Sequence, residues 1–384
     1  MIKKYKNAFL FDTEELNWKP VNKFEFNNGK FSSVIFENNT IDFNKKSIFI
    51  VPGLTDAHLH ITEEYRTEKI ESYKLEESLE KTFNRVILNL AEAKQCGITT
   101  IRDLGGFKTK SIEVLKLIKK RGLSESLPRF ITSGAMISRT NGHALNRSIV
   151  AADTSALIEE VEKLIAEGVD CIKLLNDPYV FHKEELEKVV DLCNAYNIKT
   201  SIHVFNEKAA KIAVDANVHC LEHAGDYTDK TISAIKQKGI FIVPTFIASF
   251  DTLLDQSINQ ANDLFDDADF QLFKKWFQDE CYIVPKLIEA DLKIVLGTDA
   301  GFPGTNFQSL IREMNALRFF GMKPKKIIES ATKISAEMLG LENEIGVIKK
   351  GYSADYVVLR DNPLKSFNTF YDPLEVWCKG KQIV

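Results

Sequence analysis

Apolar residues recur at intervals of three and four along the segment that precedes Gly97. They are Leu75, Leu79, Phe83, Val86, Ile87, Leu90 and Ala93. This spacing places the apolar residues on one face of a helix, where they pack against a core while the opposite face meets solvent. Glycine is a common residue at the end of a helix, and the β-rich run 98–101 follows directly. The segment therefore predicts one helix followed by one strand.

The same alternation of helix and strand repeats from about residue 54 to residue 345. Further helices are predicted at 157–165, 184–196, 207–216 and 229–238, with a long helical stretch before the last strand. Strands are predicted at 54–60, 98–102, 129–134, 169–175, 198–203, 219–223, 240–245 and 293–298. Eight parallel strands separated by helices favour closure into a barrel. We therefore predict an α/β chain in which residues 53–345 form a TIM (β/α)8 barrel.

Both ends of the chain have a different pattern, with short alternating segments separated by turns. Residues 23–26 and 33–36 alternate between apolar and polar positions and are separated by an Asn-Asn-Gly turn, which is typical of a hairpin. Residues 356–359 and 375–377 repeat this pattern near the carboxyl terminus. Residues 1–52 and 346–384 are therefore predicted to form one small β-sandwich domain built from both termini.

The composition argues against some classes of binding partner, namely nucleic acids and membranes. Hydrophobic residues make up 44% and charged residues 27% of the chain, as in ordinary globular proteins. The net charge of −4 argues against a surface for nucleic acid, because phosphate backbones are bound mainly by clustered Lys and Arg. No run is long enough for a signal-peptide core or a bilayer span, so we expect a cytoplasmic protein without a membrane partner. The six cysteines lack a CxxC spacing and are expected to be reduced thiols.

Two of the seven histidines, His58 and His60, stand two residues apart at the end of the first predicted barrel strand. Residues at this spacing face the same side of a strand, and two imidazoles there suit a divalent metal ion. A chance pair on a half-buried strand is the alternative. Three further groups favour the metal, because His203, His223 and Asp299 each end a predicted strand. Strand ends of a barrel share one face, where the chemistry of such barrels takes place.

Two other residues belong with this set. Lys173 lies inside the apolar strand 169–175, where an unpaired ammonium would be costly to bury. His143 follows the third barrel strand in the sequence Asn141-Gly142-His143, on a loop that is well placed to reach a substrate. The alternative for His143 is a loop histidine without a role.

The run 51–60 resembles the opening motif of the amidohydrolase superfamily, and the likeness covers nearly the whole chain. It continues through residues 97–103, 172–173, 222–223, 297–301 and 346–355. Within the superfamily the chain is most similar to the imidazolonepropionase and prolidase-like branch, partly because of Asn141-Gly142-His143. One departure concerns dipeptide specificity, since prolidase-like members often place an aromatic hydroxyl or a second histidine close behind the strand-five ligand. Here His203 is followed by Val204-Phe205-Asn206.

The resemblance implies a centre with two divalent metal ions, with Zn2+ expected first and Mn2+, Co2+ or Fe2+ as the other candidates. It implies that His58, His60 and Asp299 bind the more buried ion. The outer ion would be held by His203 and His223. Lys173, carboxylated by CO2, would bridge the two ions as an anionic oxygen ligand.

The chemistry of an amide sets the remaining roles. An amide is a poor electrophile, so the metals would have to activate a water molecule as hydroxide. Asp299 is then expected to take a proton from this water and pass it to the departing nitrogen. His143 is expected to bind the substrate and, with the outer metal, to stabilise the developing negative oxygen.

The leading functional prediction is hydrolysis of a linear amide, such as a dipeptide or an N-acyl amino acid with a polar or carboxylate-bearing tail. Cyclic amides, as for imidazolonepropionase, are a close second. A deaminase on the same scaffold is the enzymatic alternative, although such enzymes commonly use one metal and an unmodified site. A catalytically inactive barrel that serves as a scaffold is a further alternative. A homo-oligomer is an expectation from the family only.

Residues near the predicted ligands are assigned supporting roles. Glu222 is predicted by strand alternation to point away from the mouth of the barrel and to support the centre. Arg102 and Asp103 are expected to pair with each other or to hold the metal shell. Two histidines match nothing in the motif and are placed at the surface or beside a strand: His182 and His219. Three loop residues are candidate contacts for a substrate carboxylate: Tyr179, Tyr227 and Arg139.

Overall fold

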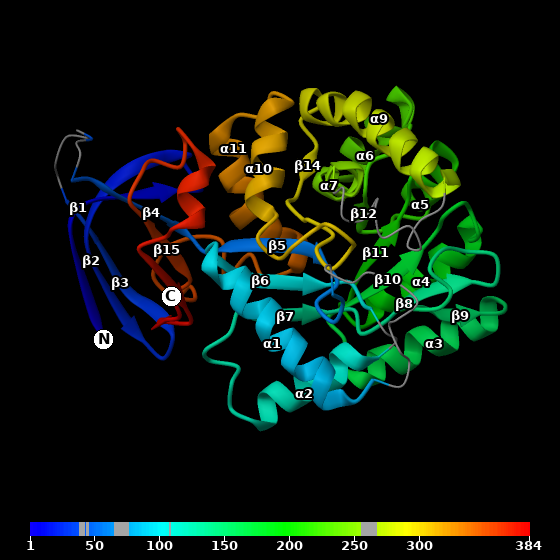
Figure 1. Ribbon diagram of the computed structural model, residues 1–384, viewed down its shortest axis with the longest axis horizontal. Coiled ribbons are helices and arrows are strands. Elements are labelled where there is room, and N and C mark those ends of the chain that lie inside the picture. Colours follow the sequence, from blue (N-terminus) through cyan, green and yellow to red (C-terminus); the bar gives the residue numbers. More distant parts are fainter. Residues whose placement is uncertain (38–42, 44–45, 65–76, 107–108, 255–266) are drawn as a thin grey trace.

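A computed structural model describes residues 1–384 except 38–42, 44–45, 65–76, 107–108, 255–266 and the side chains of 267–270. Strands from both ends of the chain form one sheet at one end of the molecule (Figure 1). Parallel strands surrounded by helices make up the rest. Within the described ranges no helix is both long enough and apolar enough to cross a membrane.

The sheet at the chain ends has seven strands in the order β17-β16-β15-β4-β1-β2-β3. These strands are β1 (Ile2–Asp12), β2 (Asn17–Asn27), β3 (Lys30–Phe36), β4 (Ile48–Pro52), β15 (Tyr356–Leu359), β16 (Glu375–Cys378) and β17 (Lys381–Gln382). Antiparallel pairing of β15 with β4 joins the two ends of the chain. One face buries Tyr5, Phe24 and Tyr356 in a core of its own, while Phe9 and Phe49 on the other face join the main core. The predicted β-rich assembly of both termini agrees with this sheet.

The parallel strands form two further sheets, in the orders β5-β6-β7 and β14-β13-β12-β11-β10-β8-β9. Their bounds are β5 (Leu54–Leu59), β6 (Ile98–Asp103), β7 (Arg129–Thr132), β8 (Met136–Arg139), β9 (Ile149–Ala151), β10 (Cys171–Leu175), β11 (Lys199–His203), β12 (Cys220–Glu222), β13 (Phe241–Val243) and β14 (Lys293–Ile294). Every predicted barrel strand thus has a counterpart. Strands β8 and β9 were not predicted.

Backbone hydrogen bonds link the two parallel sheets on both sides. On one side, Asp170 N, just before β10, donates to Thr132 O in β7 at 2.9 Å. On the other side, Asp299 N, in the segment after β14, donates to His58 O in β5 at 2.8 Å. Parallel strands are therefore connected around the whole set, which is the connectivity that the predicted barrel requires.

The helices flank the parallel strands (Figure 1). They are α1 (Leu79–Gln95), α2 (Lys110–Lys120), α3 (Thr154–Glu167), α4 (Lys183–Ala195), α5 (Glu207–Asp215), α6 (Asp229–Lys238), α7 (Phe246–Leu254), α9 (Asp267–Glu289), α10 (Leu310–Phe319), α11 (Pro324–Glu329), the π-helix η2 (Ser330–Ile334), α12 (Ser335–Leu339) and the 3-10 helix η3 (Phe367–Tyr371). Helix α3 begins where the Asp153 side chain accepts a hydrogen bond from Ala156 N, and it ends at left-handed Gly168. Leu75, the first position of the first predicted helix, lies outside the described residues.

Candidate metal centre

Side chains from five separate strand ends converge at the carboxyl edge of the parallel strands. They line one cavity of about 240 Å³. The cavity wall contains every predicted metal ligand together with His143: His58, His60, His143, Lys173, His203, His223 and Asp299. Residues that are distant in sequence therefore lie together, as the barrel prediction requires.

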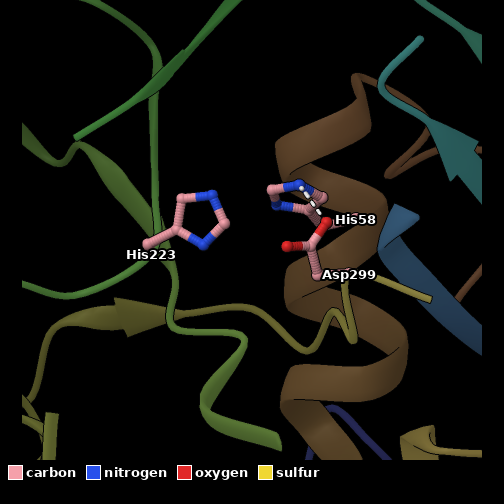
Figure 2. A group of neighbouring side chains, drawn as sticks. All are labelled: His58, His223 and Asp299. Carbon is pink, nitrogen blue, oxygen red and sulfur yellow. Dashed lines mark ion pairs between the residues drawn. The ribbon is translucent and has the colours of Figure 1, made fainter. Parts of the chain in front are cut away.

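The Asp299 carboxylate lies between two imidazoles of β5 and its end. Asp299 Oδ1 is 3.3 Å from His58 Nε2 and 3.0 Å from His60 Nε2. Figure 2 shows His58 and Asp299 in contact, with His223 facing them. The possible donor atoms of His58, His223 and Asp299 all lie within 4.8 Å of one another. This separation suits the ligands of one metal centre.

Hydrogen bonds fix which nitrogen of each β5 imidazole faces Asp299. His58 Nδ1 donates to a carboxylate oxygen of Glu222 at 2.8 Å, and His60 Nδ1 donates to the carbonyl oxygen of Gly105. Both partners are acceptors, so in the neutral rings the Nε2 lone pairs point toward the Asp299 carboxylate. Two lone pairs and an anion repel one another unless a positive charge lies among them. A divalent cation supplies that charge, and the donor set fits one.

Two more buried groups lack a partner. Lys173 Nζ and His203 Nε2 are buried without a hydrogen-bond partner among the described residues. Buried polar atoms are nearly always hydrogen-bonded, so each of these atoms needs a ligand. Burial lowers the pKa of Lys173 to about 8 and holds the pKa of His203 well below its usual range. Burial therefore increases the fraction of uncharged amine at Lys173 and keeps the His203 imidazole uncharged. Each uncharged form has a lone pair to donate.

Below the cavity, Glu222 connects His58 to Arg102. Arg102 Nη2 donates to Glu222 Oε1 at 2.7 Å, and Ser201 Oγ donates to the same oxygen at 2.5 Å. Burial alone would raise the pKa of Glu222, but the Arg102 guanidinium holds it well below its usual range. The carboxylate therefore stays ionised and orients His58, as carboxylates behind metal-bound histidines do.

The predicted direction of Glu222 was wrong, and backbone geometry explains why. Alternation assumed that His223 continues the strand, but its φ is 70°, in the left-handed region. β12 ends at Glu222, and the turn at His223 directs both side chains inward. Asp299, with a φ of 59°, and Thr245, with 52°, share this conformation at the ends of their segments. Such strained residues are concentrated at functional sites.

The segment after β14 approaches β5 very closely at Gly297. A Cβ atom at this position would lie 2.7 Å from His58 Cβ and 2.5 Å from Val243 Cγ1. The side chain of Asp56 holds the same segment, because Thr298 Oγ1 donates to Asp56 Oδ2 at 2.7 Å. Only glycine allows Asp299 to reach the β5 histidines.

Replacement of Gly297 by alanine is therefore expected to separate Asp299 from His58 and to lower the bound metal per chain several-fold. The added methyl group should also lower the free energy of unfolding by about 1–3 kcal/mol. Metal analysis and denaturant unfolding would measure the two effects. Gly122→Ala is the control, because Gly122 has a φ of 68° but no atom within 4 Å of the added Cβ. It should lower stability slightly and leave metal content unchanged, and equal metal content in both variants would contradict the explanation.

The predicted metal ligands are called the metal-donor cluster below: His58, His60, Lys173, His203, His223 and Asp299. His143 lies beside this cluster. Its ring stacks on His203 with centroids 5.0 Å apart. Gly142 brings the loop close, since a Cβ there would lie 2.2 Å from Ser138 Oγ. Burial, followed by the charge of Arg147, lowers the pKa of His143 to about 4. The imidazole is therefore neutral near pH 7 and able to donate one hydrogen bond.

Several sequence-based assignments around the site are corrected. Arg102 does not pair with Asp103, whose carboxylate accepts from Ile61 N and Thr132 Oγ1. Arg102 binds Glu222, which contacts His58, in line with its other predicted role of holding the metal shell. The three predicted carboxylate contacts do not line the cavity, since each has another partner. Tyr227 donates to Val204 O, the Tyr179 ring packs against Lys208, and Arg139 pairs with Glu185: these contacts hold them outside the cavity wall. His219 contacts Met338 O and His182 precedes α4, as expected of residues outside the site.

An aromatic wall was not predicted. Phe205 stacks on His223 with centroids 4.6 Å apart and on Trp276 with centroids 4.2 Å apart. Phe302 also lines the cavity. Phe205 was visible in the sequence only as a departure from the prolidase-like pattern. Trp276 gave no signal, because it lies on α9, far along the chain from every motif.

The chain is similar to known proteins over most of its length. The family model described as Amidohydrolase family matches residues 49–383. Ochratoxinase from Aspergillus niger is 27% identical over 381 residues, covering 86% of this chain and 75% of that protein. Imidazolonepropionase from Acinetobacter baumannii is 22% identical over 350 residues, covering 83% and 80%. A crystal structure of a Xaa-Pro dipeptidase with bound methionine has a TM-score of 0.85 at 21% identity and covers 97% of both chains.

Proposed function

The chain belongs to the amidohydrolase family, and on this basis we propose that it hydrolyses an amide-type C–N bond of a small molecule. One observation carries the proposal: two imidazole lone pairs and the Asp299 carboxylate converge beside a buried amine and imidazole without partners. We also infer that the two linked parallel sheets form one closed (β/α)8 barrel. The predicted membership of the superfamily is confirmed.

The donor set suggests how metal would be held. His58, His60 and Asp299 would bind one divalent cation, and His203 and His223 a second, with zinc as the first expectation. Bound cations would supply an acidified water molecule and polarise the substrate carbonyl. The neutral Lys173 amine would attack the carbon of CO2 and lose a proton, giving an anionic carbamate. This modification would make Lys173 a metal ligand. It would thereby explain why Lys173 Nζ is buried in an apolar strand without a hydrogen-bond partner among the described residues.

The remaining steps belong to the protein's own side chains. Asp299 would accept a proton from the attacking water and donate it to the leaving nitrogen, since its carboxylate faces the centre of the cluster. The neutral His143 ring would donate a hydrogen bond to the carbonyl oxygen as negative charge develops there. Glu222 would hold His58 in the orientation that keeps Nε2 directed at the centre.

A combined metal and substrate assay tests the proposal. Purified protein would be loaded with zinc, manganese or cobalt, with and without bicarbonate, and incubated with N-acyl amino acids, dipeptides, cyclic amides and aminopurines. We expect two metal equivalents per chain, dependence on bicarbonate, and release of an amine and a carboxylic acid from an amide. Lys173→Ala should retain fewer metal equivalents than the parent protein, because it removes the bridge.

Other outcomes separate the alternatives. One metal equivalent, no bicarbonate effect and release of ammonia from an aminopurine would indicate a deaminase instead. A protein that takes up none of the three metals and acts on none of the compounds would indicate a scaffold. Lys116→Ala is the control for the lysine replacement, since Lys116 is exposed and distant from the cavity, in an ion pair with Glu167. It should keep the parental metal content.

A further inference from the structure

A cationic side chain that the catalytic assignment does not use lines the same cavity. Arg147 follows His143 by four residues and is 15% exposed at its side chain. A turn fixes the loop, because the amide nitrogens of Arg147 and Ser148 both donate to Ala144 O at 3.0 Å. The guanidinium lies 3.7 Å from Glu63, whose backbone nitrogen donates to His60 O at 3.0 Å, so Arg147 is close to the His60 side of the cavity.

The neighbouring acid Glu63 lies within ion-pair distance of this guanidinium but forms no hydrogen bond with it. Glu63 Oε1 is 3.7 Å from Arg147 Nη1, beyond hydrogen-bond distance. Both Glu63 oxygens are buried without a hydrogen-bond partner in the described part of the chain. The forked donors of Arg147 therefore remain available within the cavity.

The charge and the apolar surface of the cavity lie at different places around the metal-donor cluster. Arg147 lies beside Glu63, next to His60, whereas the aromatic wall of Phe205 and Trp276 packs against His223. Lys173, the other cation of the cavity, is assigned to the metal centre. A ligand that fills both parts must therefore combine an anionic group with an apolar one. Guanidinium geometry suits a carboxylate, which it binds through two parallel hydrogen bonds.

We propose that Arg147 binds a carboxylate of the substrate, while the Phe205 and Trp276 wall receives an apolar or aromatic group. The substrate class is then an N-acyl amino acid or dipeptide with a free carboxylate and an apolar side chain or acyl group. This inference rests on the proposed function for the scissile amide between the two groups. Recognition of the two groups themselves does not depend on turnover.

Binding of compounds without an amide separates the two questions. Calorimetry on the metal-loaded protein would compare 4-phenylbutanoate with 4-phenylbutan-1-ol, which differ only in the charged end. We expect the acid to bind roughly 10- to 100-fold more tightly, as for a hydrogen-bonded charged pair. Arg147→Met should remove this preference and leave the affinity for the alcohol within about twofold, while Arg147→Lys should restore part of it.

Arg139→Met is the matched control, since Arg139 lies on the same connection but pairs with Glu185 outside the cavity wall. It should keep the preference for the acid. The inference is overturned if the parent protein binds both compounds equally. It is also overturned if Arg147→Met keeps the preference, or loses affinity for acid and alcohol alike. These readouts stand even if the protein hydrolyses no amide, so failure of the proposed function would be recognised separately.

Discussion

Asp299→Asn is expected to lower kcat for amide hydrolysis by about 10²–10⁴-fold, the range attributed to a positioned acid or base. Asparagine keeps the size of the side chain but has no proton-accepting carboxylate. It also removes the anion that lies between His58 and His60, so the metal at this position should bind more weakly. Initial rates with the best amide from the substrate assay, at saturating metal, would measure the loss.

Two measurements make this result specific. Circular dichroism should show an unchanged fold, since asparagine is nearly isosteric with aspartate. Asp361→Asn is the control for the substitution, because Asp361 is exposed and distant in the structure from the cavity lining. It should retain the parental rate. Parental turnover by Asp299→Asn under the same conditions would disprove the proton-transfer role.

Arg102→Met is expected to lower the free energy of unfolding by about 3–5 kcal/mol, the cost of leaving one charge of a buried pair without its partner. Arg102 and Glu222 are both almost completely buried, and their ion pair measures 2.7 Å. Without Arg102, Glu222 would keep its hydrogen bonds with Ser201 and His58 but lose its guanidinium partner. Denaturant unfolding of the parent and variant, monitored by circular dichroism, would give the difference.

A double variant and a surface pair test the explanation. Arg102→Met with Glu222→Gln should recover part of the lost stability, since it removes the unpaired charge. Metal binding at His58 should be weaker than in the parent protein, because the carboxylate that orients His58 is lost. Lys116→Met breaks an exposed pair with Glu167, where the side chains are 62% and 51% exposed. It should cost about 0–1 kcal/mol. A similar cost for the buried and exposed variants would show that the Arg102–Glu222 pair contributes no special stability.

The sequence by itself determined the parts of this protein that depend on local pattern. The spacing of apolar residues placed the helices and parallel strands. Apolar residues recur every three to four positions in a helix and every second position in a strand, and this repeat can be read from one segment alone. His58, His60, His203, His223 and Asp299 were each placed at the end of a predicted strand, and strand ends of parallel units share one edge. Their convergence could therefore be predicted without coordinates.

Local pattern failed where the backbone departs from regular geometry. Alternation gave the wrong direction for Glu222, because the left-handed conformation of His223 is held by neighbouring strands and is not encoded in residue type. The hydrogen bond from His223 N to Val243 O, across to β13, is one such contact. Tertiary packing also selected Glu222 rather than Asp103 as the partner of Arg102.

Only the tertiary structure decided what surrounds the metal-donor cluster. Arg147 and Trp276 come from a loop and a distant helix, where no periodic pattern marks a residue that faces the cavity. The absence of a partner for Lys173 Nζ within the described residues is likewise a property of its neighbours in space. Sequence motifs record which groups can donate to a metal, whereas close packing in three dimensions determines which charges remain unpaired and which surfaces a substrate meets.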